Sequence, residues 1–222
     1  MSNDSATTDD VRRITQGVYF TLPDALPRGR HNLSREQVVG AQRERILAAM
    51  TELLAARGHR SFGPGDIVRR AGVSLHAFYA SFENKDACVF AGYDRFIDVL
   101  LGRMTVVDVR GLEPPQIVHA LLTAWLATLQ ADTVVARAYT VEIDALGIES
   151  RERRRHALGL FATYIRQLTA QHGFELPWTA CIGVVYAARQ LAADALDTEA
   201  EPDLGALGDE LEGWLLDTFR AR

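Results

Sequence analysis

The stretch from Phe62 to Phe82 constrains the fold of this chain more than any other. Its apolar residues follow a helical spacing up to Ala71, break at Gly72 and resume at Ala77. Gly72 supplies the backbone freedom that a helix end needs, and Ser74 can accept a hydrogen bond from the first amides of the next helix. The spacing therefore predicts two short helices across a tight turn, which is a helix-turn-helix unit.

In such a unit the second helix can lie in the major groove of DNA while the first braces it across the backbone. Two short helices around a glycine are also common in helical proteins of any kind. The unit taken alone therefore leaves DNA binding and plain helical packing as alternatives.

The flanks of this unit extend the pattern. Gly58 ends the preceding helix, and the run Asn84, Lys85 and Asp86 follows the unit. Together with the unit between them, these residues closely resemble the DNA-binding domain of the TetR family of bacterial repressors, over roughly Gln42 to Val89 and without a gap. The resemblance implies an all-α fold, in which an N-terminal three-helix helix-turn-helix DNA-binding head is joined to a larger helical ligand-binding and dimerisation body.

The length of 222 residues and the hydrophobic fraction of 48% allow one large helical domain or a small domain joined to a larger one. There is no run of about 18 uncharged apolar residues, so we expect no membrane span. Acidic residues precede the first basic ones at the N-terminus, unlike a secretory signal, so we expect a cytoplasmic protein. Cys88 and Cys181 lie far apart within apolar helical patterns and are expected to be buried free thiols.

The net charge of -5 is unevenly distributed. Residues 28–86 carry ten Lys or Arg and six Asp or Glu, whereas the rest of the chain carries 14 and 23. A basic segment beside an acidic remainder suits a protein in which one part meets phosphates. A local excess of this size is also ordinary, so the charge supports DNA binding without deciding it.

We divide the chain into a partly basic N-terminal arm (1–33), a helix-turn-helix DNA-binding domain (34–88) and a helical effector-binding and dimerisation domain (89–222). The arm is too short for a core of its own, and its first part is expected to be flexible or to pack on a neighbour. Removal of residues 1–30 is expected to leave thermal stability nearly intact, because this stretch offers little apolar surface.

Arg28 and Arg30 lie immediately before the first helix, with the flexible Gly29 between them. The stretch around them has no apolar periodicity, so it can be a solvated linker. The alternative is an arm that places both arginines in or beside the minor groove of DNA, as other helix-turn-helix proteins do.

The first helix is expected to open at Ser34 with a capping box and to run to Gly58. Pro64 suits the first position of the second helix, but Gly63 stands where the family usually has Thr or Ser. A phosphate bound at this helix end must therefore rely on backbone amides and the helix dipole. A fourth helix is expected from Asp86 to about Met104, and further helices at about 116–130, 132–147, 151–172, 177–197 and 203–220.

The recognition helix spans about Leu75 to Ser81 and contains no arginine, so base reading must depend on His76, on methyl contacts and on DNA shape. By resemblance, Tyr79 bonds a phosphate through its hydroxyl and Lys85 meets another at the start of the fourth helix. Each can instead be an ordinary surface residue. The predicted DNA-binding residues are Ser74, Leu75, His76, Tyr79, Ala80, Ser81, Lys85, Arg28 and Arg30.

The resemblance also implies a small molecule bound among the middle helices of the body. The aromatic and polar candidates also suit a plain core; they are Trp125, Tyr139, Glu142, Phe161, Tyr164 and Tyr186. A mostly apolar pocket would match an apolar or aromatic effector. Members of the family form homodimers through their last two long helices, and the apolar stripes at 178–196 and 204–219 fit either such an interface or an internal core.

The sequence therefore predicts a DNA-binding transcriptional regulator, a repressor released from a palindromic double-stranded operator by a small, largely apolar ligand, with no metal and no cofactor. The alternative is a helical ligand-binding or scaffold protein with weak or no sequence-specific DNA binding. An enzyme is a third class. The chain lacks the His-Glu-x-x-His, Cys-x-x-Cys and Gly-x-Ser-x-Gly motifs, a glycine-rich phosphate loop, and any histidine pair at metal-ligand spacing on one helix.

Overall fold

The computed structural model describes residues 11–14, 17–21, 34–173, 175–199 and 201–220, and over these residues the chain is helical with no strand. The all-α expectation is confirmed. The head consists of α1 (Arg35–Arg57), α2 (Pro64–Ala71) and α3 (Leu75–Ser81), with a short 3-10 segment, η2 (His59–Ser61), after α1. The helices of the body, with the 3-10 segment η3, are α4 (Lys85–Thr105), α5 (Pro114–Ala131), α6 (Thr133–Thr140), η3 (Glu142–Leu146), α7 (Ile148–Gln171), α8 (Trp178–Thr198) and α9 (Leu204–Arg220).

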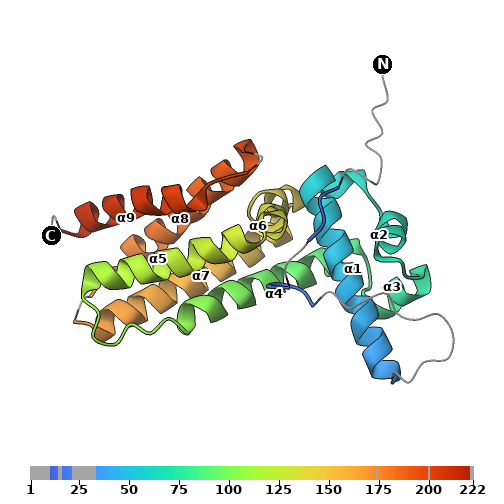
Figure 1. Cartoon of the computed structure of the whole chain (residues 1–222), viewed down its shortest axis with the longest axis horizontal. Coiled ribbons are helices and arrows are strands. Elements are labelled where there is room, and N and C mark those ends of the chain that lie inside the picture. Colours follow the sequence, from blue (N-terminus) through green and yellow to red (C-terminus); the bar gives the residue numbers. More distant parts are fainter. Residues whose placement is uncertain (1–10, 15–16, 22–33, 174, 200, 221–222) are drawn as a thin grey trace, which may run out of the picture.

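The head lies at one end of an elongated body (Figure 1). Within the body α5 packs on α4 and α9, and α7 packs on α8. The long helix α1 contacts α2 and α3 of the head and also α4 and α6 of the body. The position of the head relative to the body therefore depends on the contacts of α1 with α4 and α6. Among the described helices no single one is long and apolar enough to cross a bilayer, and only α5 with the α6–η3 segment meets that test, as a pair bent by 103°.

The head helices begin and end at the residues from which sequence analysis predicted their ends. The Ser34 hydroxyl accepts from the Gln37 amide at 3.2 Å, and the Gln37 side chain accepts from the Ser34 amide at 2.8 Å. This confirms the expected capping box. Gly58 and Gly72, which end α1 and α2, have φ values of 67° and 64°, a region that favours glycine.

The single helix expected over residues 132–147 is wrong, because α6 ends at Thr140 and η3 follows. The guanidinium of Arg189, buried on α8, donates to the Thr140 carbonyl at 2.5 Å and to the Asp144 carboxylate at 3.1 Å. A carbonyl held by a side chain no longer needs a partner four residues further on, so the helix can end there. This contact joins residues that are 49 positions apart.

The segment before α1, which we call the N-terminal strap (residues 11–14 and 17–21), packs into the core. Val11, Ile14, Tyr19 and Phe20 are each at most 6% exposed. The Ile14 amide donates to Glu52 on α1 at 2.8 Å, and the Tyr19 hydroxyl donates to the Thr128 carbonyl on α5 at 2.8 Å. The strap thus bridges head and body.

This position corrects the expectation that residues 1–30 contribute little apolar surface and that their removal leaves stability intact. Tyr19 packs against Phe96 of α4, with ring centroids 5.5 Å apart, and the Arg95 guanidinium lies 5.3 Å from the centre of the Phe20 ring. Burial of side chains of this size contributes several kcal/mol. The strap is therefore expected to be a major contributor to stability.

We predict that Phe20→Ala lowers the free energy of unfolding by about 3–5 kcal/mol, because it leaves a cavity under Arg95. Urea unfolding followed by circular dichroism measures this change. Val106→Ala is the matched control, since Val106 is 77% exposed and should change stability by less than about 0.5 kcal/mol. A loss below about 1 kcal/mol for Phe20→Ala would show that the strap is not packed in solution.

Candidate nucleic-acid interface

Helix α3 presents a continuous outer face. The Ser74 hydroxyl caps it by accepting from the Ala77 amide at 3.1 Å. Phe78 is fully buried on the inner side. Of the residues predicted to meet DNA, Leu75 is 46% and Tyr79 54% exposed; Ser74, His76 and Ala80 are exposed and Ser81 is half-buried.

The angle between α2 and α3 is set by their turn. Gly72 adopts the left-handed conformation (φ 64°, ψ 39°), and the Val73 amide donates to the Val68 carbonyl at 3.1 Å. A Cβ at Gly72 would also lie 2.8 Å from the Arg45 guanidinium. A larger residue is therefore disfavoured by its conformation, whereas the end of the long Arg45 side chain could move aside.

The start of α2 is capped from inside the helix. Gly63 has no side chain to offer, but the Asp66 carboxylate accepts from the Gly63 amide at 2.9 Å. This hydrogen bond, assisted by Arg69, holds the pKa of Asp66 below its usual value. Sequence analysis missed this role, although an acidic residue three positions after a helix start is a recognisable signal.

Lys85 has a structural role that sequence analysis also missed. Its ammonium donates to the carbonyls of His59 at 2.6 Å and Phe62 at 3.0 Å, and it lies 4.9 Å from the centre of the Phe62 ring. Burial lowers the pKa of Lys85. An ammonium has three N–H donors, so one remains for the predicted phosphate contact. Lys85 therefore fixes the α1–α2 connection whether or not it also meets DNA.

Arginines on α1 and α2 brace the head from within. The Arg43 guanidinium lies 4.2 Å from the centre of the Phe82 ring and donates to the Ser81 carbonyl at the end of α3 at 2.9 Å. The Arg70 guanidinium on α2 pairs with Glu52 on α1, and both side chains are at least 93% buried. These two contacts fix α2 and α3 against α1, so the outer face of α3 is held in one orientation.

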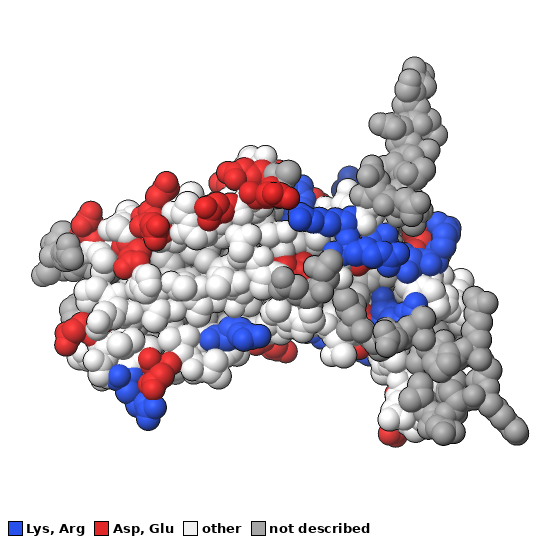
Figure 2. Space-filling view, in the orientation of Figure 1, with Lys and Arg blue, Asp and Glu red and all other residues white. Residues whose placement is uncertain are grey.

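The surface charge differs between the two ends of the molecule (Figure 2). On the face shown there, Lys and Arg side chains gather over the head around α1 and α2, whereas Asp and Glu side chains gather along α9. This separation agrees with the uneven charge of the sequence and places the basic end beside the helix-turn-helix unit. Arg28 and Arg30 lie outside the described residues, so their contact with DNA stays a prediction.

The six predicted effector residues lie outside two cavities of the molecule. A groove of about 520 Å³ lies between α5 and α9, and a second cavity of about 350 Å³ lies between α1, α6 and α8; none of the six lines either one. Tyr139 and Phe161 are buried, whereas Tyr186 is 39% exposed. Trp125 and Tyr164 are half-buried, and the Tyr164 hydroxyl donates to the Met104 carbonyl at 3.1 Å. Their role in ligand binding stays a prediction.

Glu142 lies in η3 beside Gly58, which ends α1, and its carboxylate is 3.7 Å from Arg137. Burial raises the pKa of Glu142, while the guanidinium opposes that shift. Among the residues that the structure describes, no group of three or more His, Cys, Asp or Glu side chains is arranged to hold a metal ion.

Residues 46–91 match the family model of bacterial regulatory proteins, tetR family. The head is a TetR-family DNA-binding domain. The match covers the second half of α1, all of α2 and α3, and the start of α4, which are the elements that position the outer face of α3. No curated protein matches this chain significantly.

Solved structures share the TetR-type fold over head and body together. The fatty acid degradation regulator FadR from Bacillus halodurans has a TM-score of 0.66 at 20% identity, covering 80% of this chain and 95% of that one. FadR from Bacillus subtilis, solved in complex with stearoyl-CoA, has a TM-score of 0.67 at 17% identity, covering 77% and 96%. A transcriptional regulator from a Rhodococcus species has a TM-score of 0.63 at 24% identity, covering 79% and 96%.

Restoring the usual TetR-family hydroxyl at the start of α2 tests that helix end. Gly63 has an extended backbone (φ -126°), and a Cβ there meets nothing within 4 Å. We predict that Gly63→Ser raises the unfolding free energy by about 0.5 kcal/mol and strengthens DNA binding on all sequences. Gly65→Ser, two residues further on within α2 and equally free of close neighbours, should not strengthen DNA binding. Equal effects of the two changes on affinity would contradict a phosphate contact at the cap.

A second prediction separates affinity from sequence preference. Lys85→Ala should weaken binding similarly on all sequences and reduce the salt slope by about one unit, because it removes one phosphate contact. His76→Ala should cost roughly 1–3 kcal/mol on the best site and relax one base position. Titrations over a salt series, with selection of binding sites from random DNA, measure both effects. An unchanged consensus for His76→Ala would show that His76 reads no base.

Proposed function

We propose that this chain is a dimeric transcriptional regulator that binds operator DNA through α3 and releases it when a small, largely apolar ligand binds the body. The outer face of α3, held on a braced TetR-type head, is the observation that carries the proposal. A protein of this function works in the cytoplasm, where its DNA lies.

In this proposal the exposed residues of α3 divide into two groups. Leu75, His76 and Ala80 face the bases, and the Tyr79 hydroxyl, at the tip of a half-exposed side chain, bonds a phosphate. Since α3 carries no arginine, bidentate reading of guanine is absent from this helix. Specificity then comes from His76, from apolar contacts with thymine methyl groups and from DNA shape.

The last two helices supply the proposed dimer interface. Leu204, Leu211 and Leu215 of α9 are buried within the chain, so part of the apolar stripe of α9 belongs to the internal core. Trp214 on α9 and Tyr186 on α8 remain 44% and 39% exposed. Large exposed aromatics are common anchors of protein interfaces. A two-fold dimer would present two copies of α3, so the operator should be a pseudo-palindrome.

A contact between Tyr139 and α1 offers a route from the body to the head. The Tyr139 hydroxyl on α6 lies 2.7 Å from the Thr51 hydroxyl on α1. A Cβ at Gly92 on α4 would lie only 1.9 Å from the same Tyr139 oxygen. Three helices therefore meet with no spare space, and a ligand that moves α4 or α6 must also move α1.

The ligand class is proposed from chemistry and from one neighbour. The body is rich in apolar and aromatic side chains, and the structurally similar FadR from Bacillus subtilis was solved with stearoyl-CoA, which carries a long apolar chain. Stearoyl-CoA is therefore a suitable first probe. A ligand that releases DNA must bind the released state more tightly, and by linkage operator DNA weakens the binding of that ligand by the same factor.

Sequencing of genomic fragments selected by the purified protein tests the proposal. Enrichment of fragments that share an inverted repeat is the expected result. The second candidate is a helical ligand-binding or scaffold protein, which is favoured by Gly63 and by the use of Lys85 to hold two backbone carbonyls. A gel shift without any sequence preference would support that candidate and contradict the first.

For the dimer, we predict that Trp214→Ala weakens self-association at least tenfold, because an interface anchor contributes about 2 kcal/mol or more. Sedimentation equilibrium over a concentration series measures the dimer dissociation constant. Leu160→Ala on α7 is the control, since Leu160 is 40% exposed and lies outside the last two helices. If both changes, or neither, altered self-association, the interface would lie elsewhere.

For the route between body and head, we predict that Tyr139→Phe reduces the effect of a saturating ligand on operator affinity. The change removes the hydrogen bond to Thr51 and should cost about 0.5–1.5 kcal/mol of stability. Operator affinity with and without saturating ligand gives the coupling. Tyr164→Phe, which loses only a bond to Met104 within the body, is the matched control. An unchanged coupling in Tyr139→Phe would exclude this route.

A further inference from the structure

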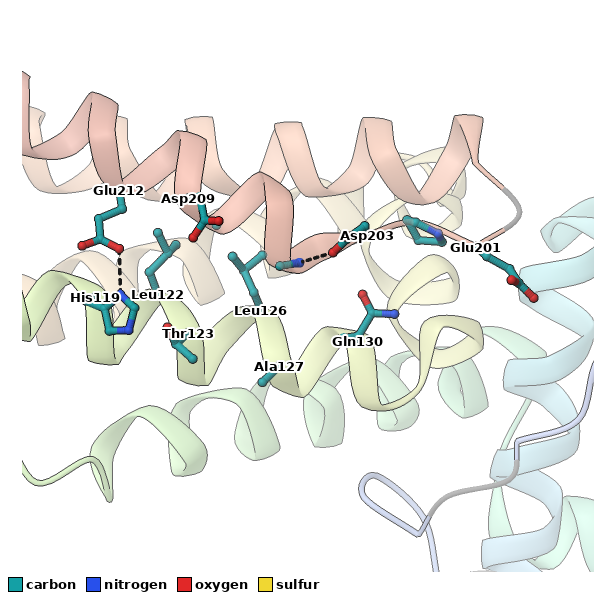
Figure 3. A pocket seen from close by; sticks show the side chains of 13 residues that line it. His119, Leu122, Thr123, Leu126, Ala127, Gln130, Glu201, Asp203, Asp209 and Glu212 are labelled. Atoms are coloured by element: carbon teal, nitrogen blue, oxygen red, sulfur yellow. Dashed lines mark hydrogen bonds and ion pairs between the residues drawn. The ribbon is translucent and has the colours of Figure 1, made fainter.

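The groove between α5 and α9 has one apolar wall (Figure 3). Leu122 and Leu126 stand on α5 four residues apart, so they share one face of that helix, and Ala127 also lines the groove. The α5 lining extends from His119 to Gln130, which spans about 16 Å at a rise of about 1.5 Å per residue. This wall suits an elongated apolar group.

The opposite wall is acidic. It comes from α9 and the residues just before it, and its charged side chains are the carboxylates of Glu201, Asp203, Asp209 and Glu212. No Lys or Arg is among the described residues that line the groove. Carboxylates beside a low-dielectric wall attract cations and disfavour anions.

The four carboxylates differ in what they already bind. Asp203 caps α9 by accepting from the amides of Gly205 and Ala206, and Glu212 lies 2.7 Å from His119 across the groove. Glu201 is 4.0 Å from Arg12. Asp209 projects toward the groove (Figure 3) and has no hydrogen bond or ion pair within the described part of the chain. Asp209 is thus the carboxylate most available to a cation.

The size of the groove favours a small molecule over a macromolecule. Its volume of about 520 Å³ lies within the range of about 300–1,000 Å³ that is usual for small-molecule sites. A stable protein partner would need an interface of about 1,000 Å² or more. We therefore propose that this groove binds an amphipathic organic cation, with its apolar body along Leu122 and Leu126 and its charge between Asp209 and Glu212.

This site is separate from the proposed dimer interface. Trp214 lies about 200° around α9 from Glu212, at about 100° per residue, so it faces away from the groove. The inference concerns ligand binding alone and does not rest on DNA binding. A test on the protein without DNA therefore leaves the proposed function untouched if it fails.

Isothermal titration calorimetry with decyltrimethylammonium, kept below its micelle concentration, tests the site. We expect one cation per chain, and decyl sulfate of the same chain length should bind at least about tenfold more weakly. Asp209→Asn and Glu212→Gln should each weaken the cation about two- to fivefold, as for partly exposed ion pairs. Glu210→Gln is the matched control, because Glu210 is exposed on α9 but does not line the groove.

A steric variant completes the test. Ala127 is exposed in the groove, so Ala127→Trp should fill it and abolish binding of the cation while the thermal unfolding midpoint stays unchanged. Equal affinity for the sulfate, or cation binding that survives both Ala127→Trp and Asp209→Asn, would overturn the proposal. A change in self-association for Asp209→Asn and Glu212→Gln without a change in cation affinity would also overturn it, because a second copy would then cover the groove.

Discussion

Glu52 carries a negative charge into the protein interior, and three parts of the chain meet around it. Its carboxylate pairs with the Arg70 guanidinium and accepts from the Ile14 amide, while Arg70 also donates to the Val11 carbonyl. Removal of one partner from a buried ion pair typically costs about 3–5 kcal/mol, because the other charge is left uncompensated. The placement of α1, α2 and the strap is therefore fixed together. Helix α3 follows, since it packs on α1 and α2.

The residue before Glu52 makes the corresponding contact with the body. Thr51 is fully buried, donates to the Leu47 carbonyl at 2.8 Å, and lies against the Tyr139 hydroxyl. Two adjacent side chains on α1 thus contact different elements: Glu52 pairs with Arg70 on α2, and Thr51 contacts Tyr139 on α6. A small rotation of α1 would disturb both sets of contacts at once, which is the property that a connection between a ligand site and a DNA-binding face requires.

Sequence analysis predicted what depends on local backbone chemistry. Gly72 ends α2 and Ser74 caps α3 through interactions with neighbouring residues alone. The helix-turn-helix unit and the outward face of α3 could therefore be predicted from residue spacing. The strap did not, because its apolar residues are too few for a period and are buried only by distant helices. The break after α6 depends on Arg189, far along the chain. Aromatic residues such as Tyr139 and Phe161 fill cores as readily as they bind ligands, so their residue type did not locate a pocket.

The strap also changes where the molecule can be divided. A fragment that begins at Arg35 keeps all three head helices, yet it lacks the amide that satisfies Glu52 and the rings of Tyr19 and Phe20 that lie beside Phe96 and Arg95. Such a fragment would expose apolar surface on α1 and α4 that the whole protein keeps from water. A chimera that exchanges heads between relatives must therefore carry the strap together with the body residues that it contacts, because the strap, the head and the body share one core.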